Sequence, residues 1–128
     1  MPNLSINTSA ILPDAVAKNA LLTALSHAVA SVMGKPEEYV MVTLTHSDVC
    51  FASNAGQPAA FCQLSSIGGL TNEVNKRLAA KVCELLGAHL HVPSDRVYIV
   101  FQDVKVPRLR PISPSSSDRI TGLSLGIR

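Results

Sequence analysis

The first part of the chain passes from an alternating hydrophobic pattern to a helical one and back again. Residues 3–8 alternate aliphatic with polar side chains, which predicts a half-buried strand. Residues 13–33 carry aliphatic side chains three or four positions apart, which predicts a helix. Gly34 then ends the helix and Pro36 prevents its resumption. Residues 39–46 alternate once more and predict a second strand.

The second part repeats this order of patterns. After a polar connection over residues 47–58, residues 59–67 predict a third strand and the glycine pair at 68–69 predicts a turn. Residues 71–89 have helical spacing, and residues 96–102 alternate as a fourth strand.

Two β-α-β units of similar length predict an α+β fold, with a four-stranded mixed sheet and both helices on one face. The second face of such a sheet stays bare, so we expect it and the edge strands to associate with a partner. Residues 1–104 are expected to form the domain. Residues 105–128, with several prolines and serines and no sustained period, are expected to be an irregular extension.

Length and composition narrow the function. A chain of 128 residues, 47% hydrophobic and 4% aromatic, suits one compact domain with little aromatic surface for stacking nucleotide bases, so nucleic-acid binding is not expected. No apolar run approaches the roughly 20 residues that cross a bilayer, and no charged leader precedes a hydrophobic stretch. We therefore expect a cytoplasmic protein without membrane insertion.

Charge and cysteine content add two further points. Residues 1–104 carry six Lys/Arg against eight Asp/Glu, whereas residues 105–128 carry five against one, so the net charge of +2 comes from the tail. The three cysteines are an odd number at spacings that match no metal or dithiol motif, and the four histidines lack companions. We expect no metal, no other cofactor and no disulfide framework.

Pro2 is the strongest candidate for chemistry. Methionine is usually removed before a small residue, and an α-amino group titrates at about 7.7–8.0, within reach of neutral pH. Burial or a nearby cation lowers its pKa further, so a free Pro2 amine could act as a base. Lys35, on a constrained link between helix and strand, is a candidate cation. Many chains begin Met-Pro for no chemical reason, and Lys35 has the alternative of an ordinary surface lysine.

Several segments together resemble the macrophage migration inhibitory factor family of the tautomerase superfamily, over about residues 2–104. The matching segments are Met1-Pro2, Gly34-Lys35-Pro36, Tyr39-Val40, Phe51, Pro58, Ser66-Ile67-Gly68-Gly69-Leu70, Asp95-Arg96-Val97-Tyr98-Ile99 and Asp103. Their order and spacing are more specific than any one of them.

The resemblance implies a homotrimer with an active site at each subunit interface. It also implies an isomerase that interconverts keto and enol forms of phenylpyruvate-like acids or acts on dopachrome analogues. Pro2 matches the catalytic base, and Lys35, Ser66, Ile67 and Tyr98 match substrate-binding positions, with Tyr98 contributed by the neighbouring subunit. Tyr98 has the alternative of a packed strand tyrosine.

The chain departs from the family pattern in three places. The first cysteine of the redox C-x-x-C pair is Ala59, so no oxidoreductase activity is expected, and Val100 replaces a common polar residue. The chain has no tryptophan, which the family carries near its C-terminus. A cytokine-like regulatory binding protein with a protein receptor and little tautomerase activity therefore stays the alternative, as does secretion without a signal peptide.

Overall fold

The computed structural model describes residues 1–105 and contains four strands, two long helices and two 3-10 turns. In chain order these are β1 (Asn3–Thr8), α1 (Ala15–Met33), η1 (Glu37–Tyr39), β2 (Met41–His46), β3 (Ala60–Ser66), α2 (Asn72–Leu90), η2 (Ser94–Arg96) and β4 (Val97–Asp103). The expected tail begins at the end of this range, so the prediction for residues 106–128 lies outside the described residues.

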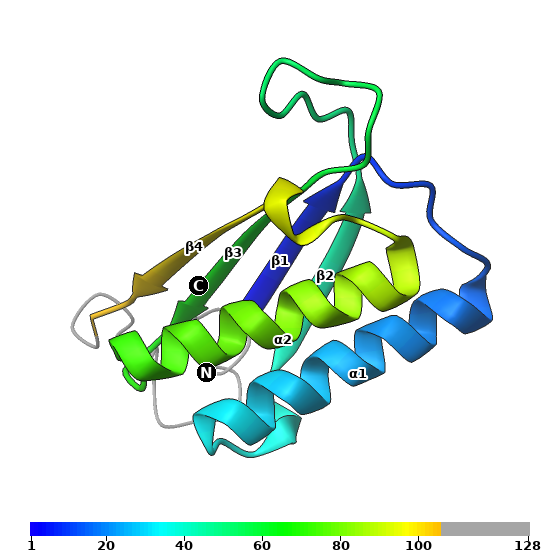
Figure 1. Cartoon of the computed structure of the whole chain (residues 1–128). Helices are drawn as coiled ribbons and strands as arrows, with labels where there is room; N and C mark the ends of the chain where they lie inside the picture. Colours follow the sequence, from blue (N-terminus) through cyan, green and yellow to red (C-terminus); the bar gives the residue numbers. More distant parts are fainter. Residues whose placement is uncertain (106–128) are drawn as a thin grey trace.

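The strands form one mixed sheet in the order β2-β1-β3-β4. Each β-α-β unit contributes a parallel pair, β1 with β2 and β3 with β4, and the two units meet where β1 runs antiparallel to β3. Figure 1 shows both helices lying side by side over one face of the sheet. The predicted α+β fold, with its duplicated units and mixed sheet, is confirmed.

The core lies between the sheet and the helices. Alternate residues of β1, Leu4 and Ile6, are fully buried, and so are Leu21 and Leu25 of α1 and Leu86 of α2. Full burial of each such side chain contributes roughly 1.5–3 kcal/mol of transfer free energy. This aliphatic layer fixes the register of β1, since a slip by one residue would turn its apolar face away from the helices.

The helix ends are fixed by the residue types that the sequence places there. The Asp14 side chain accepts a hydrogen bond from the Ala17 N–H at 2.9 Å and caps α1, and Thr71 caps α2 by accepting from the Val74 N–H at 3.1 Å. Gly34 ends α1 in the left-handed conformation at φ 65°. Lys35 therefore leaves the helix at a defined point.

Two expectations need correction. Tyr39 lies in η1 and not in a strand, because β2 begins only at Met41. The second concerns the membrane: α1 is long and apolar enough to cross a bilayer by length and composition, contrary to the expectation that no segment is. The same helix contributes Leu21 and Leu25 to the core, and core helices of soluble proteins pass the same test.

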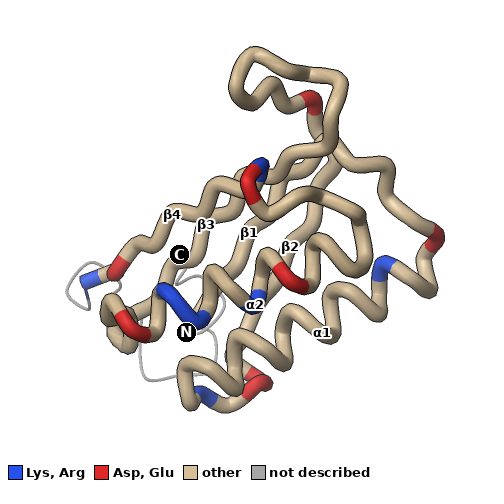
Figure 2. Tube along the Cα trace, viewed as in Figure 1, with Lys and Arg blue, Asp and Glu red and all other residues tan. Residues whose placement is uncertain are grey.

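The other face of the sheet is uncovered by the described residues and carries no formal charge. Strand alternation and burial place on it mostly amide and hydroxyl side chains, with a few apolar ones. The residues are Asn3, Ser5, Asn7, Met41, Thr43, Thr45, Phe61, Gln63, Ser65, Tyr98, Val100 and Gln102. In Figure 2 the strands are free of marked charge up to Asp103, at the end of β4. The bare face that the sequence predicts is therefore largely polar and uncharged.

The loop between β2 and β3 is held by Arg96, whose side chain is buried. Its guanidinium donates hydrogen bonds of 2.7–3.1 Å to the carbonyls of Phe51, Asn54, Gln57 and Pro58. It also lies 5.5 Å from the centroid of the Phe51 ring. One side chain thus fixes a loop that the sequence shows only as a polar connection.

Candidate active site

The start of β1 lies beside the end of β3. The antiparallel register pairs Asn3 with Ser65, so Pro2 lies next to Ser66 along the sheet. The Pro2 side chain is fully buried, and its carbonyl accepts a hydrogen bond from the Met41 N–H at 3.0 Å. Pro2 is therefore anchored between β2 and β3, and its backbone position is defined.

Lys35 reaches the same end of the sheet from the C-terminus of α1. Its Nζ donates a hydrogen bond to the Ile67 carbonyl oxygen at 3.2 Å, and its backbone N–H donates to Ala30 at 3.0 Å. The side chain passes close to Gly69, where a Cβ atom would lie 3.2 Å from Lys35 Cε. Lys35 is thus partly buried and directed at the turn after β3.

That turn is itself held by hydrogen bonds. The Ser66 hydroxyl donates to the Gly68 carbonyl at 2.8 Å, and the Gly68 N–H donates to Asp103 Oδ1 at 3.0 Å. Gly68 and Gly69 adopt φ angles of 73° and 83°, which glycine accepts without strain. The turn presents the backbone of Ile67 in a fixed orientation.

A pocket of about 440 Å³ opens at this point and is lined by Met1, Lys35, Pro36 and Tyr39. Tyr39 was expected in a strand, and its half-exposed ring lines the pocket from η1 instead. The sign of this placement in the sequence is the spacing of three residues from Pro36 to Tyr39, which equals one turn of a 3-10 helix. The pocket is mainly apolar beside one cation.

This environment lowers the pKa of the α-amino group of Met1. Burial lowers its pKa below the ordinary value of 8.0, and the charge of Lys35 lowers the pKa further. In this chain the amine belongs to Met1. Removal of Met1 would place it on Pro2, the more deeply buried residue.

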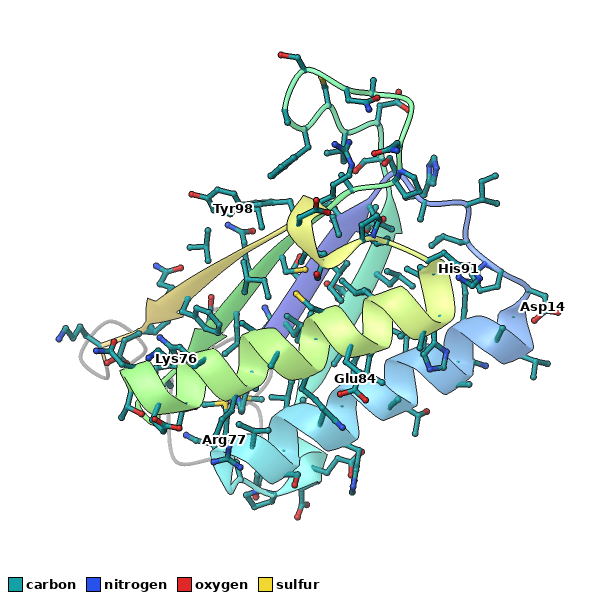
Figure 3. All side chains as sticks on the ribbon, in the orientation of Figure 1. Asp14, Lys76, Arg77, Glu84, His91 and Tyr98 are labelled. Atoms are coloured by element: carbon teal, nitrogen blue, oxygen red, sulfur yellow. The ribbon has the colours of Figure 1, made fainter. Side chains whose placement is uncertain are left out.

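Tyr98 is not part of this cluster within one chain. It is the second residue of β4 and pairs in register with Phe61, whereas the end of the sheet near Pro2 is marked by Ser66 and Asp103. Five strand positions separate the two, which is about 17 Å at ~3.3 Å per residue. Tyr98 is labelled in Figure 3, and its ring is exposed and lies 5.9 Å from that of Phe61.

The structure therefore brings Pro2, Lys35, Ser66 and Ile67 to one end of the sheet and leaves Tyr98 at the other. Within residues 1–105 no three His, Cys, Asp or Glu side chains gather in a way that could hold a metal ion. Cys62 is buried in the core, and burial together with Cys83 raises its pKa to about 12.

Fold and site together define a duplicated β-α-β protein with a pocket built around its N-terminal residue. Residues 1–110 match the family described as macrophage migration inhibitory factor, and the chain belongs to this family. The macrophage migration inhibitory factor of Rattus norvegicus is 33% identical over 104 residues, covering 81% of this chain and 89% of that protein. A homolog from Brugia malayi is 34% identical over 105 residues, covering 82% of this chain and 90% of the homolog.

Solved structures agree. The homologue from Prochlorococcus marinus is 34% identical with a TM-score of 0.77, covering 88% of this chain and 96% of that one. The factor from Toxoplasma gondii is 30% identical with a TM-score of 0.79, covering 88% and 97%. Family membership supports a tautomerase or cytokine-like function in broad terms.

Proposed function

We propose that the protein is a keto-enol tautomerase in which Pro2, once Met1 is removed, is the general base. The observation that carries the proposal is the gathering of Pro2, Lys35 and the Ile67 turn at one end of the sheet, with the pocket lined by Met1 and Lys35 beside them. The reaction moves one proton between a carbon next to a ketone and the ketone oxygen, and it needs no oxidant and no cofactor.

The base must be neutral to accept a proton from carbon. The lowered pKa of the Met1 amine supports this requirement, because burial and Lys35 would act on an amine at Pro2 in the same direction. A base with a pKa near the working pH combines a useful neutral fraction with enough basicity, and positioned general bases accelerate reactions by about 10²–10⁴-fold.

Lys35 has the second role. One of its Nζ hydrogens is directed at the Ile67 carbonyl, and an ammonium group has three donors, so two hydrogens are left for a substrate carboxylate. The Ser66–Ile67 backbone lies beside Pro2 at the same end of the sheet and, in this proposal, supplies an N–H donor toward a developing enolate oxygen. The apolar lining from Tyr39 and Pro36 favours an aromatic substrate such as phenylpyruvate or a dopachrome-like compound.

Tyr98 joins the site only if a second subunit supplies it. Its place about 17 Å along the strand direction from the end of the sheet that holds Pro2 supports such an intersubunit contribution. The uncharged open face and the two edge strands, β2 and β4, offer surfaces for association. We propose a homotrimer with three shared sites, in the cytoplasm.

The alternative is a cytokine-like regulatory protein that binds a receptor and has little or no tautomerase activity. It is favoured by the names of the relatives, which describe migration inhibitory factors, and by Val100 on the open face. An intact trimer without turnover would support this alternative.

The test is turnover of phenylpyruvate by mature protein whose N-terminus has been verified by mass spectrometry. Pro2→Gly keeps an α-amine but loses the ring, and Lys35→Gln removes the cation. We expect Pro2→Gly to lower kcat/KM by about 10²-fold or more and Lys35→Gln chiefly to raise KM. Lys18→Gln, on the far end of α1, is the control. Equal turnover by the native protein and Pro2→Gly would refute the proline mechanism.

A further inference from the structure

One peptide unit in the site is held at both of its polar ends. The carbonyl of Ile67 accepts a hydrogen bond from Lys35 Nζ at 3.2 Å. The N–H of the same peptide, which belongs to Gly68, donates to Asp103 Oδ1 at 3.0 Å. The Lys35 ammonium and the Asp103 carboxylate therefore both hydrogen-bond to the same peptide, one at its C=O and one at its N–H.

The geometry of the peptide places these charges on opposite sides. The described residues contain no cis peptide bond, and a trans peptide directs its C=O and N–H away from each other. Lys35 and Asp103 form no direct salt bridge within residues 1–105. Among residues 1–105 the connection between them runs through the Ile67–Gly68 peptide, as a chain of carboxylate, N–H, C=O and ammonium.

We propose that Asp103 is a positioning residue that fixes Lys35 through the Ile67–Gly68 peptide. A hydrogen bond to a carboxylate polarises the amide and strengthens the bond that its carbonyl accepts. Loss of the Asp103 contact frees the peptide to rotate, and rotation by even a fraction of its range removes the acceptor that orients the Lys35 ammonium.

The surroundings of Asp103 support a dedicated role. It is the last residue of β4, paired in register with Ser66, and the next residue continues that pairing because the Val104 N–H donates to the Ser66 carbonyl at 2.8 Å. Among all residues of the four strands it is the only formally charged one. The end of β4 thus places the Asp103 carboxylate at the turn after β3.

This inference rests on the proposed function for its catalytic consequence, because Lys35 is assigned there to the substrate carboxylate. Its structural part stands independently, since the peptide is held whether or not a substrate is turned over. The experiment therefore needs one readout for each part.

Two variants of the full, mature chain separate the hydrogen bond from the strand. Asp103→Val has no acceptor but suits a strand end, and Asp103→Asn keeps an acceptor oxygen. Asp48→Val, at an exposed position in the loop after β2, is the control. Asp103→Ala repeats the measurement if Asp103→Val proves unstable in a thermal melt. The readouts are KM and kcat for phenylpyruvate, amide exchange of Gly68 and NMR relaxation of Lys35 Cε, with Lys76 as the reference lysine.

We expect Asp103→Val to raise KM by about tenfold with kcat within about threefold, to speed Gly68 exchange by about tenfold and to increase the motion of Lys35. Asp103→Asn, which keeps the acceptor oxygen but loses the charge, should lie between the native protein and Asp103→Val. Gly68 exchange and Lys35 motion unchanged in Asp103→Val would overturn the inference, as would Asp103→Asn behaving like Asp103→Val. If the native protein has no turnover, the proposed function fails, and Gly68 exchange with Lys35 motion decides the inference alone.

Discussion

Gly69 and Lys35 are in contact range: a Cβ atom at Gly69 would lie 3.2 Å from Lys35 Cε. This is tighter than ordinary van der Waals contact, so any side chain at Gly69 displaces the lysine by a few tenths of an ångström. Gly68 has a similar positive φ, but a Cβ there meets nothing within 4 Å. The two neighbouring glycines therefore form a matched pair.

Gly69→Ala and Gly68→Ala are expected to destabilise the fold to a similar extent, by about 1–2 kcal/mol each, because both place a Cβ in the left-handed region. Only Gly69→Ala also moves Lys35, so KM for phenylpyruvate should be several times higher than in Gly68→Ala. Urea denaturation and steady-state kinetics on both variants measure the two effects. Equal KM values would show that the position of Lys35 does not affect substrate binding.

The electrostatic effect of Lys35 is measurable in protein that retains Met1. Burial is the larger cause of the lowered Met1 pKa and Lys35 the smaller, so Lys35→Gln should raise the pKa of that amine but leave it below 8.0. Titration of the α-amine by NMR gives both values, and Lys18→Gln should change neither. If Lys35→Gln left the pKa of the Met1 amine unchanged, the charge of Lys35 would not be a cause of the lowered pKa.

The same pKa shift gives a pH dependence of stability. The folded amine has a lower pKa than the unfolded one, so the unfolded chain binds more protons in the window just below 8.0. The free energy of unfolding of the Met1-retaining chain should therefore rise with pH through this window and level off above it. Acetylation of the amine should abolish that rise, and urea melts at several pH values would detect it.

Arg96 is expected to be important for stability. Its buried guanidinium satisfies four carbonyls of the loop between β2 and β3, so Arg96→Ala should lower the free energy of unfolding by about 2–4 kcal/mol. Arg96→Lys should recover only part, because an ammonium cannot span four acceptors. The exposed Arg77 provides the control, where substitution by Ala should stay within about 0.5 kcal/mol. Similar denaturation midpoints for the Arg96→Ala and Arg77→Ala variants would contradict this.

Cysteine reactivity should follow burial. The pKa of Cys62, raised to about 12 by burial and by Cys83, leaves almost no thiolate at neutral pH, whereas Cys50 is exposed. Iodoacetamide on the native protein should modify Cys50 and leave Cys62 untouched until denaturant is added. Mass spectrometry locates the label, with Cys50→Ser as the control, and modification of native Cys62 would be inconsistent with the described core.

The sequence patterns predicted the order and type of every strand and long helix, because alternation and helical spacing report directly on which side chains are buried. They placed the buried stripe of the helices less well. Leu22 and Leu85 also fit the spacing of three or four residues, yet both are only partly buried, while Leu21 and Leu86 are fully buried. The helices pack against each other as well as against the sheet, and this shifts the buried face.

Pairwise contacts in the site lay beyond the reach of pattern analysis. Lys35 and the Ser66–Ile67 turn could be named from a family resemblance, but the bond from Lys35 to the Ile67 carbonyl depends on three-dimensional register. Tyr39 was expected in a strand because it alternates with Met41 and Thr43. The 3-10 turn that contains Tyr39 begins directly after Pro36, and the alternating pattern did not reveal this turn.

The central claim is that the amine of Pro2 is the base, and the two N-terminal forms of one preparation test it most directly. Protein that retains Met1 and the same protein after aminopeptidase digestion differ by a single residue, and Met1 lines the pocket. The account predicts that trimming raises kcat/KM for phenylpyruvate by about 10²-fold or more. Equal activity of the two forms would contradict it.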